Sequence, residues 1–213
     1  MVALLLAAAL AGGVLAVLPA GVSASQRASL VLAYISLGAL VATLAIGPLR
    51  VIRQRANPVS NDLRRDLGIL SGMSGLAHVV FSFQHHVGGV VTRYFFSSDR
   101  LSLSNLRRDW FGVANDIGLA AALLLVLLMA ISNDRSLRRL GPRWKRLQRT
   151  AYVLATLTFV HMTLFWKISH RRPAIVLAAA LAVAAVIVLQ LVGFARHPRR
   201  LRSRGEQGRA VSA

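Results

Sequence analysis

Four histidines lie within or at the ends of apolar segments of this 213-residue chain. His78, His85 and His86 fall in the stretch SGLAHVVFSFQHHVGG, and His161 falls in TLTFVHMTLFWK. Ionisable side chains are costly inside a membrane span, so they indicate a functional site by default. An imidazole can bind haem iron or another metal, carry a proton, or hydrogen-bond a neighbouring helix.

The segments that hold these histidines are long enough to cross a membrane. Apolar residues make up 55% of the chain and gather into six runs, most of them close to the roughly 20 residues that span a bilayer. The fold class predicted is therefore all-α, an integral membrane bundle of six transmembrane helices. The runs cover residues 2–18, 30–49, 67–83, 111–131, 151–168 and 174–195. The connections are too short for a soluble catalytic domain and carry no nucleotide-binding signature.

The runs divide the chain into four segments. Residues 1–49 are expected to form two N-terminal spans, 50–172 a binding core, 173–195 a sixth span and 196–213 a basic cytoplasmic tail. The first run is followed by V-S-A at residues 22–24, which is typical of a signal-peptidase site. It has no Lys or Arg before its apolar core, so we expect a retained, short first helix rather than cleavage.

The net charge of +19 does not indicate nucleic-acid binding, because the 26 basic residues lie almost wholly in connections and the tail. Of these, 18 fall on one predicted side of the membrane and eight on the other. The positive-inside rule then predicts a multi-pass protein of the inner (plasma) membrane with both termini cytoplasmic. Trp110, Trp144 and Trp166 fall at predicted helix ends, as interfacial aromatic residues do. The absence of cysteine excludes disulfides and iron–sulfur clusters.

Two of the histidines are predicted to lie at one depth. Ser60 or Asn61 can cap the third span, and Pro142 can start the segment that leads into the fifth. Both spans enter from the cytoplasmic side, because odd-numbered spans run in the same direction. His78 follows the last arginine of its flank by 13 residues and His161 follows its own by 12, which places both about 18–20 Å into the membrane. Level imidazoles on co-directional helices favour a pair of axial ligands to one haem iron.

Other interpretations of these patterns remain. A single buried histidine can simply bond a neighbouring helix, and a proton path would want carboxylates, of which Asp116 alone falls inside a span. Small residues beside His78 would let a flat ring approach the backbone, but we favour helix packing for them. They are Ser71, Ser74, Gly75 and Ser82.

The segment from NPVSNDLRRDLG to FVHMTLFWK, about residues 50–170, resembles the ferric reductase-like transmembrane domain family. A basic stretch, then DLG, then a span-centred histidine is matched by RRLG, RWKRLQR and a second span-centred histidine. That family includes the haem-binding membrane subunit of a periplasmic methionine sulfoxide reductase system and the membrane cores of NADPH oxidases. The resemblance implies b-type haem inside a six-helix bundle, with His78 and His161 as the ligands of the haem nearer the outer face.

One position departs from the family. A further histidine is often found where KRLQRTAY has Gln148, and no histidine stands at that level of the third span, where Arg64 and Arg65 lie. An amide does not replace imidazole as an ordinary haem ligand. We therefore expect one haem b, with a second haem as the alternative.

Four titratable residues lie near the outer end of the predicted site. His85 and His86 lie about 10.5–12 Å beyond His78, where water or a haem propionate can satisfy them; the alternative is a second metal or haem site. Arg93 can pair with a propionate or reach the interface, and Asp116 can pair with one of these cations.

These observations predict a haem-binding membrane electron-transfer subunit of an oxidoreductase. It would take electrons from a quinone or a separate reductase and deliver them to an outer-face acceptor, either a protein or ferric iron. Whether the chain is itself an enzyme is left open. The competing interpretation is a non-redox membrane scaffold or small transporter with structural or proton-binding histidines.

Overall fold

The computed structural model describes residues 1–19, 21–53, 59–98, 102–169 and 177–195. Within these ranges the regular structure is helical, apart from one isolated β-bridge between Phe96 and Leu106. The long helices are α1 (Val2–Val17), α2 (Ala24–Arg53), α3 (Val59–Val87), α5 (Trp110–Ile131), α8 (Ala151–Ser169) and a last helix at Leu177–Ala195. The short ones are α4 (Thr92–Phe95), the 3₁₀ turn η1 (Leu103–Asn105), α6 (Asp134–Leu140) and α7 (Pro142–Gln148).

The prediction of an all-α membrane bundle is confirmed, but the number of spans is confirmed only in part. Five helical segments are long and apolar enough to cross a bilayer: α2, α3, α5, α7 joined with α8, and the last helix. At 16 residues, α1 reaches about 24 Å, short of the roughly 30 Å hydrocarbon core. The third span begins at Val59, so Ser60 and Asn61 lie inside the helix and the predicted cap was two to three residues late.

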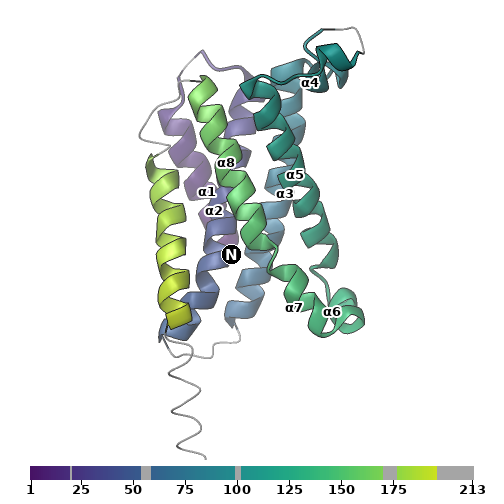
Figure 1. Cartoon of the computed structure of the whole chain (residues 1–213). Coiled ribbons are helices and arrows are strands. Elements are labelled where there is room, and N and C mark those ends of the chain that lie inside the picture. Colours follow the sequence, from purple (N-terminus) through teal and green to yellow (C-terminus); the bar gives the residue numbers. More distant parts are fainter. Residues whose placement is uncertain (20, 54–58, 99–101, 170–176, 196–213) are drawn as a thin grey trace, which may run out of the picture.

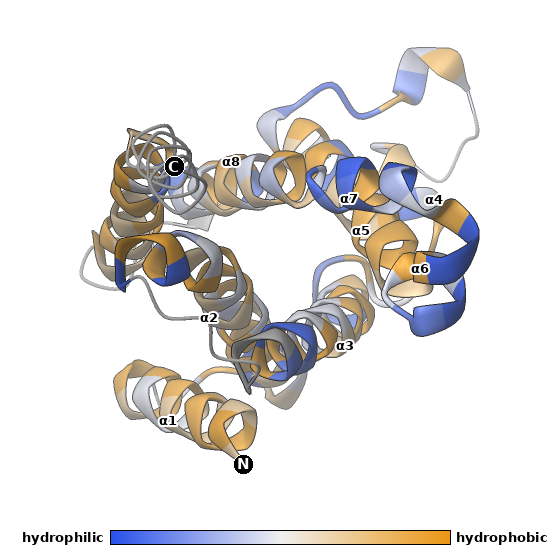
Figure 2. Cartoon of the chain, turned by 90° about the horizontal axis from the view of Figure 1, so that it is seen from below, coloured by the Kyte–Doolittle hydropathy of each residue, from blue (hydrophilic) through white to orange (hydrophobic). Residues whose placement is uncertain are grey.

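The long helices run roughly side by side, with the short helices at the two ends of the bundle (Figure 1). We call these ends the α4 end and the α6–α7 end. Viewed from below, α2, α3, α5, α8 and the last helix are arranged around a common axis, and α1 lies outside beside α2 and α3 (Figure 2). The main contacts join α2 to α3 and α5 to α8. The tail 196–213 lies outside the described residues.

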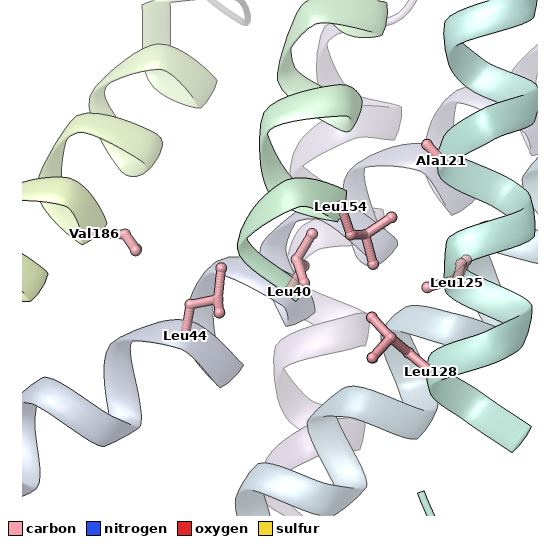
Figure 3. Close-up of a cluster of buried hydrophobic side chains, with 7 residues drawn as sticks. All are labelled: Leu40, Leu44, Ala121, Leu125, Leu128, Leu154 and Val186. Atoms are coloured by element: carbon pink, nitrogen blue, oxygen red, sulfur yellow. The ribbon is translucent and has the colours of Figure 1, made fainter. Parts of the chain in front are cut away.

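Seven buried aliphatic side chains gather between the helices toward the α6–α7 end, and we call them the leucine-rich cluster (Figure 3). The cluster joins α2, α5, α8 and the last helix. Its buried members are Leu40, Leu44, Ala121, Leu125, Leu128, Leu154 and Val186. Large apolar side chains on the outward faces, such as Leu123 and Leu181, are exposed, as expected of helices that contact lipid.

A proline in α2 is compensated by the last helix. Pro48 has no N–H to donate to the carbonyl of Leu44 one turn earlier, so that oxygen loses its usual helical partner. Gln190 Nε2 donates to Leu44 O at 2.9 Å, and Tyr152 Oη donates to Gln190 Oε1 at 3.2 Å. One side-chain amide thus links α2, α8 and the last helix while satisfying a backbone group that lies in an apolar setting.

The small residues of α3 mainly serve helix packing, as favoured from the sequence. Ser71 Oγ donates to Ser36 O at 2.9 Å and Ser36 Oγ donates to Ser71 O at 2.8 Å, which ties α3 to α2. A Cβ on Gly75 would lie 2.7 Å from Leu125 Cδ2 and 2.8 Å from Ser36 Oγ, so α2 and α5 pack closely there. Among the four predicted small residues, Ser82 is the one that lines the cavities described below.

Candidate functional site

His78 is oriented by the backbone of α2. Its Nδ1 lies 2.8 Å from Ser29 O and 3.1 Å from Ser29 Oγ. A carbonyl oxygen can only accept a hydrogen bond, so Nδ1 carries the proton and the lone pair of the ring resides on Nε2. Ser29 is buried and precedes the predicted 50–172 core, so α2 also supports the site.

His161 is held in the same way by α5. Its Nδ1 lies 2.7 Å from Ala114 O, which again assigns the proton to Nδ1 and the lone pair to Nε2. That carbonyl already accepts the helical bond of Gly118, one turn later. A Cβ on Gly118 would lie 2.6 Å from both Nδ1 and Cε1 of His161. Glycine at this position therefore leaves the space through which the imidazole reaches the backbone.

The two imidazoles face each other across the bundle. Their ring centroids are 6.4 Å apart and their planes meet at 75°. Two ring nitrogens bound to one metal at about 2.0 Å, each about 1.1 Å from its ring centre, give centroids about 6.2 Å apart. Metal-binding histidines also usually donate their second N–H to a carbonyl or carboxylate, as both do here. The pair therefore fits two axial ligands of one metal.

A porphyrin would need no protein ligand beyond this pair of imidazoles. In the described part of the chain no group of three or more His, Asp or Glu side chains is placed to hold a metal. A porphyrin supplies four nitrogens itself and needs two axial protein ligands at most. Two cavities flank the imidazole pair, and His78, His161, Ser82 and His86 line both, so a flat ring could extend to either side.

The cavities differ in their other walls. The first lies between α2, α3 and α8 and includes Tyr34, Thr158, Met162 and Phe165. The second lies between α3, α5, α8 and the α4 segment and includes Phe83, Phe95, Asn115 and Leu119. Both are mainly apolar, which suits the body of a porphyrin.

His86 is nearer to the site than its distance along α3 implies. Its ring centroid lies 5.2 Å from Phe165 and 5.6 Å from Phe111, and Phe165 lies 4.9 Å from His161. His85 packs against His86 at 4.7 Å but lines neither cavity. The two outer histidines are therefore not equivalent. The spacing along the sequence predicts His85, seven residues after His78, on almost the same helix face as His78, and His86 about a quarter turn away, but His86 is the one that lines the cavities.

The polar residues at the α4 end differ in how far they are buried. Arg93 is exposed on α4 and lines neither cavity. Tyr94 Oη donates to Asn115 O at 2.6 Å, and burial, with a smaller contribution from the Asp116 carboxylate, raises the pKa of Tyr94 to about 12. The phenol thus stays a neutral donor near neutral pH. Asp116 itself is exposed.

At the opposite end, Gln148 is engaged in helix packing. Its Nε2 donates to Ser132 Oγ at 3.2 Å, which joins the end of α7 to the end of α5. Trp144 Nε1 also bonds Ile131 O at 2.9 Å. The Gln148 amide therefore forms a hydrogen bond between helices, at the position where the ferric reductase-like family often has a histidine.

Several supporting groups were not identified from the sequence. They are Ser29, Ala114, Asn115 and Gly118. Two of them act through backbone carbonyls, which carry no residue-type signal. Gly118 had no distinguishing pattern within an Ala- and Leu-rich helix, whereas Asn115, a polar residue next to Asp116 inside a span, was a signal that could have been used.

Fold and site together define a multi-span helical membrane protein with a paired-histidine site between its helices. The chain is 32% identical over 129 residues to the heme-binding subunit MsrQ of the protein-methionine-sulfoxide reductase of Rhizobium meliloti (strain 1021). The matched region covers 61% of this chain and 53% of that protein, so the chain matches about half the length of this curated relative. No family profile matches the chain. No solved structure matches it either.

Proposed function

We propose that the chain is a haem-binding membrane electron-transfer subunit of an oxidoreductase, with His78 and His161 as the axial ligands of one haem b. The observation that carries the proposal is the pair of imidazoles at 6.4 Å, each with its Nδ1 on a backbone carbonyl. The similarity to a protein named as a heme-binding reductase subunit supports it. Haem iron bound in this way exchanges one electron at a time between its ferric and ferrous states.

The protein's own contribution is to fix and shield the ligands. The carbonyls of Ser29 and Ala114 hold the tautomer and the orientation of each ring and raise its basicity. Apolar walls, including Phe165 and Leu119, exclude water from the iron. A low-dielectric setting with few charged groups then tunes the reduction potential through the ligands and their hydrogen bonds.

We further propose that one haem rather than two is present. The leucine-rich cluster lies in the half of the bundle toward the α6–α7 end, and Gln148 is bonded to Ser132 there. Electrons would come from a quinone or a separate reductase and leave to an acceptor at the outer face. That acceptor is either a sulfoxide-reducing protein, in line with the relative's name, or ferric iron, in line with the ferric reductase-like resemblance.

The test is the visible spectrum and haem stoichiometry of the full chain purified in detergent. We expect a Soret band, b-type bands on reduction and one haem per chain. His78→Ala and His161→Ala should each abolish stable haem binding, whereas Gln148→Ala should leave the stoichiometry unchanged. His85→Ala is the matched histidine control, because His85 lines neither cavity.

Two results would overturn the proposal. A colourless, iron-free protein from haem-supplied cells would favour the scaffold or transporter interpretation. Full low-spin haem in either His78→Ala or His161→Ala would show that the ligands lie elsewhere. Two haems per wild-type chain would disprove the single-haem statement alone.

A further inference from the structure

Asn115 is a buried amide with an unused hydrogen-bond donor. The side chain is 7% exposed, and its Nδ2 has no hydrogen-bond partner in the described structure. The nearby phenol of Tyr94 bonds the backbone carbonyl of Asn115 and not its amide. A buried donor without an acceptor is costly, and such groups are rare in folded proteins. The amide therefore indicates an acceptor that the chain itself does not supply.

The position of Asn115 limits where that acceptor lies. Asn115 lines the cavity between α3, α5 and α8, together with His78 and His161. It directly follows Ala114, whose carbonyl orients His161. The amide donor and the carbonyl that orients His161 thus lie on the same turn of α5. Any ligand held between the two histidines and filling this cavity would extend beside the amide.

The other buried nitrogen without a partner among the described side chains is Arg107 Nε. Its guanidinium lies over the Phe111 ring, with Cζ 4.6 Å from the centroid. Arg107 lines neither cavity. Asn115 is therefore the group that carries the inference.

We propose that Asn115 donates a hydrogen bond through Nδ2 to a propionate carboxylate of the bound haem. This inference rests on the proposed function and adds a positioning residue to it. The propionates are the strong acceptors at the porphyrin edge, and a hydrogen bond to an ionised group is stronger than one between neutral groups. A neutral amide fixes which way round the porphyrin lies in the cavity without adding a buried charge. Arg93, the sequence-based candidate for this role, is exposed outside the cavity.

The experiment compares two porphyrins that differ in their carboxylates. Iron mesoporphyrin has two propionates, whereas iron etioporphyrin has alkyl groups in their place. Each is titrated into full-length, haem-depleted protein in detergent, and the dissociation constant is read from the Soret band. The variants are wild type, Asn115→Leu and the control Gln84→Leu, which makes the same amide-to-leucine change at an exposed site of α3 outside both cavities.

We expect Asn115→Leu to weaken binding of iron mesoporphyrin about tenfold and to leave binding of iron etioporphyrin unchanged. Gln84→Leu should change neither. Asn115→Asp, which is nearly the same shape, should also weaken mesoporphyrin selectively through charge repulsion, and it keeps the test valid if the leucine variant does not fold. The midpoint potential of each loaded variant provides a readout independent of activity.

Equal weakening of both porphyrins by Asn115→Leu would overturn the inference, because it would indicate a packing role. No effect on either porphyrin would overturn it as well. Both results leave the His78 and His161 assignment intact. Failure of the wild-type chain to bind either iron porphyrin would instead overturn the proposed function, and this inference with it.

Discussion

At the scale of single residues, backbone carbonyls determine what the two central imidazoles can do. A histidine whose Nδ1 donates to a carbonyl presents Nε2 as its basic atom, and this holds for both His78 and His161. In both cases the carbonyl belongs to a neighbouring helix rather than to the histidine's own. Contacts between helices therefore make Nε2 the basic atom of each ring before any ligand binds.

Gly118 should be required for this arrangement. In Gly118→Ala the new Cβ would lie 2.6 Å from two atoms of the His161 ring, which must then leave the carbonyl of Ala114. We expect haem affinity to fall about tenfold or more, as overpacking costs about 1–3 kcal/mol. Haem titration of the variant measures this. The control is Gly68→Ala, because nothing lies within 4 Å of a Cβ there; equal affinities in both variants would contradict the prediction.

His86 and His85 should differ in their effect on the haem. Because His86 lines both cavities and packs on Phe165, His86→Ala should shift the midpoint potential or its pH dependence while preserving haem content. His85→Ala should cause a smaller shift. Redox titration with parallel iron analysis of each variant and of the double variant measures this. Loss of haem from folded His86→Ala protein would make His86 a ligand.

At the scale of helices, each element near the site supports another. Helix α5 provides the carbonyl for His161, the space at Gly118 and the buried amide of Asn115, and its far half contributes three residues to the leucine-rich cluster. Helix α2 provides the carbonyl for His78 and is itself joined to the last helix through Gln190. The site therefore depends on how these helices are held together.

The link between Pro48 and Gln190 can be measured as a double-mutant cycle. Gln190→Leu removes the donor to Leu44 O and should destabilise the protein by about 1–3 kcal/mol, since the carbonyl is left unsatisfied. In a Pro48→Ala background the N–H of residue 48 can satisfy that carbonyl, so Gln190→Leu should cost less. Thermal unfolding in detergent of the four variants gives the coupling. Additive effects of the two substitutions on the free energy of unfolding would show that Gln190 does not compensate for the missing N–H of Pro48.

At the scale of the whole molecule, the two ends of the bundle carry different charge. The α6–α7 end bears most of the arginines described, whereas one of the two cavities beside the histidine pair is lined by Tyr94 and Phe95 of α4, at the other end of the bundle (Figure 1). Because basic loops remain cytoplasmic, the α6–α7 end is expected to face the cytoplasm. The haem would then lie nearer the outer face, which suits electron delivery to an external acceptor.

Cysteine labelling tests this orientation. The chain has no cysteine, so single substitutions give a clean background. A membrane-impermeant thiol reagent applied to intact cells should label cysteine at Ser98 or His170 and should not label cysteine at Ser60 or Ser136. Labelling of all four after membrane disruption serves as the control. The reverse pattern in intact cells would invert the proposed direction of electron flow.

The sequence by itself determined the membrane class, the helical architecture and the candidate ligands. Apolar runs near the length of a bilayer predict helices, because every backbone polar group must be satisfied within lipid. A histidine inside such a run is costly and therefore marks a candidate functional site. The sequence placed helix starts less accurately. Helix α3 begins at Val59, before the predicted caps Ser60 and Asn61, because the first residue of a helix depends on local hydrogen bonds. The short first helix was expected from the apolar run at residues 2–18, and the structure gives its bounds as Val2–Val17.

Only the tertiary structure decided what surrounds the two imidazoles. The carbonyls of Ser29 and Ala114 are common to every residue type, so no sequence pattern marks them. The separation of His86 from His85, the exclusion of Arg93 from the cavities and the burial of Asn115 depend on how α3, α4 and α5 pack. The sequence gives the position of each residue along its helix. The rotation of each helix about its axis, and the residues that it contacts, are decided by packing between the helices.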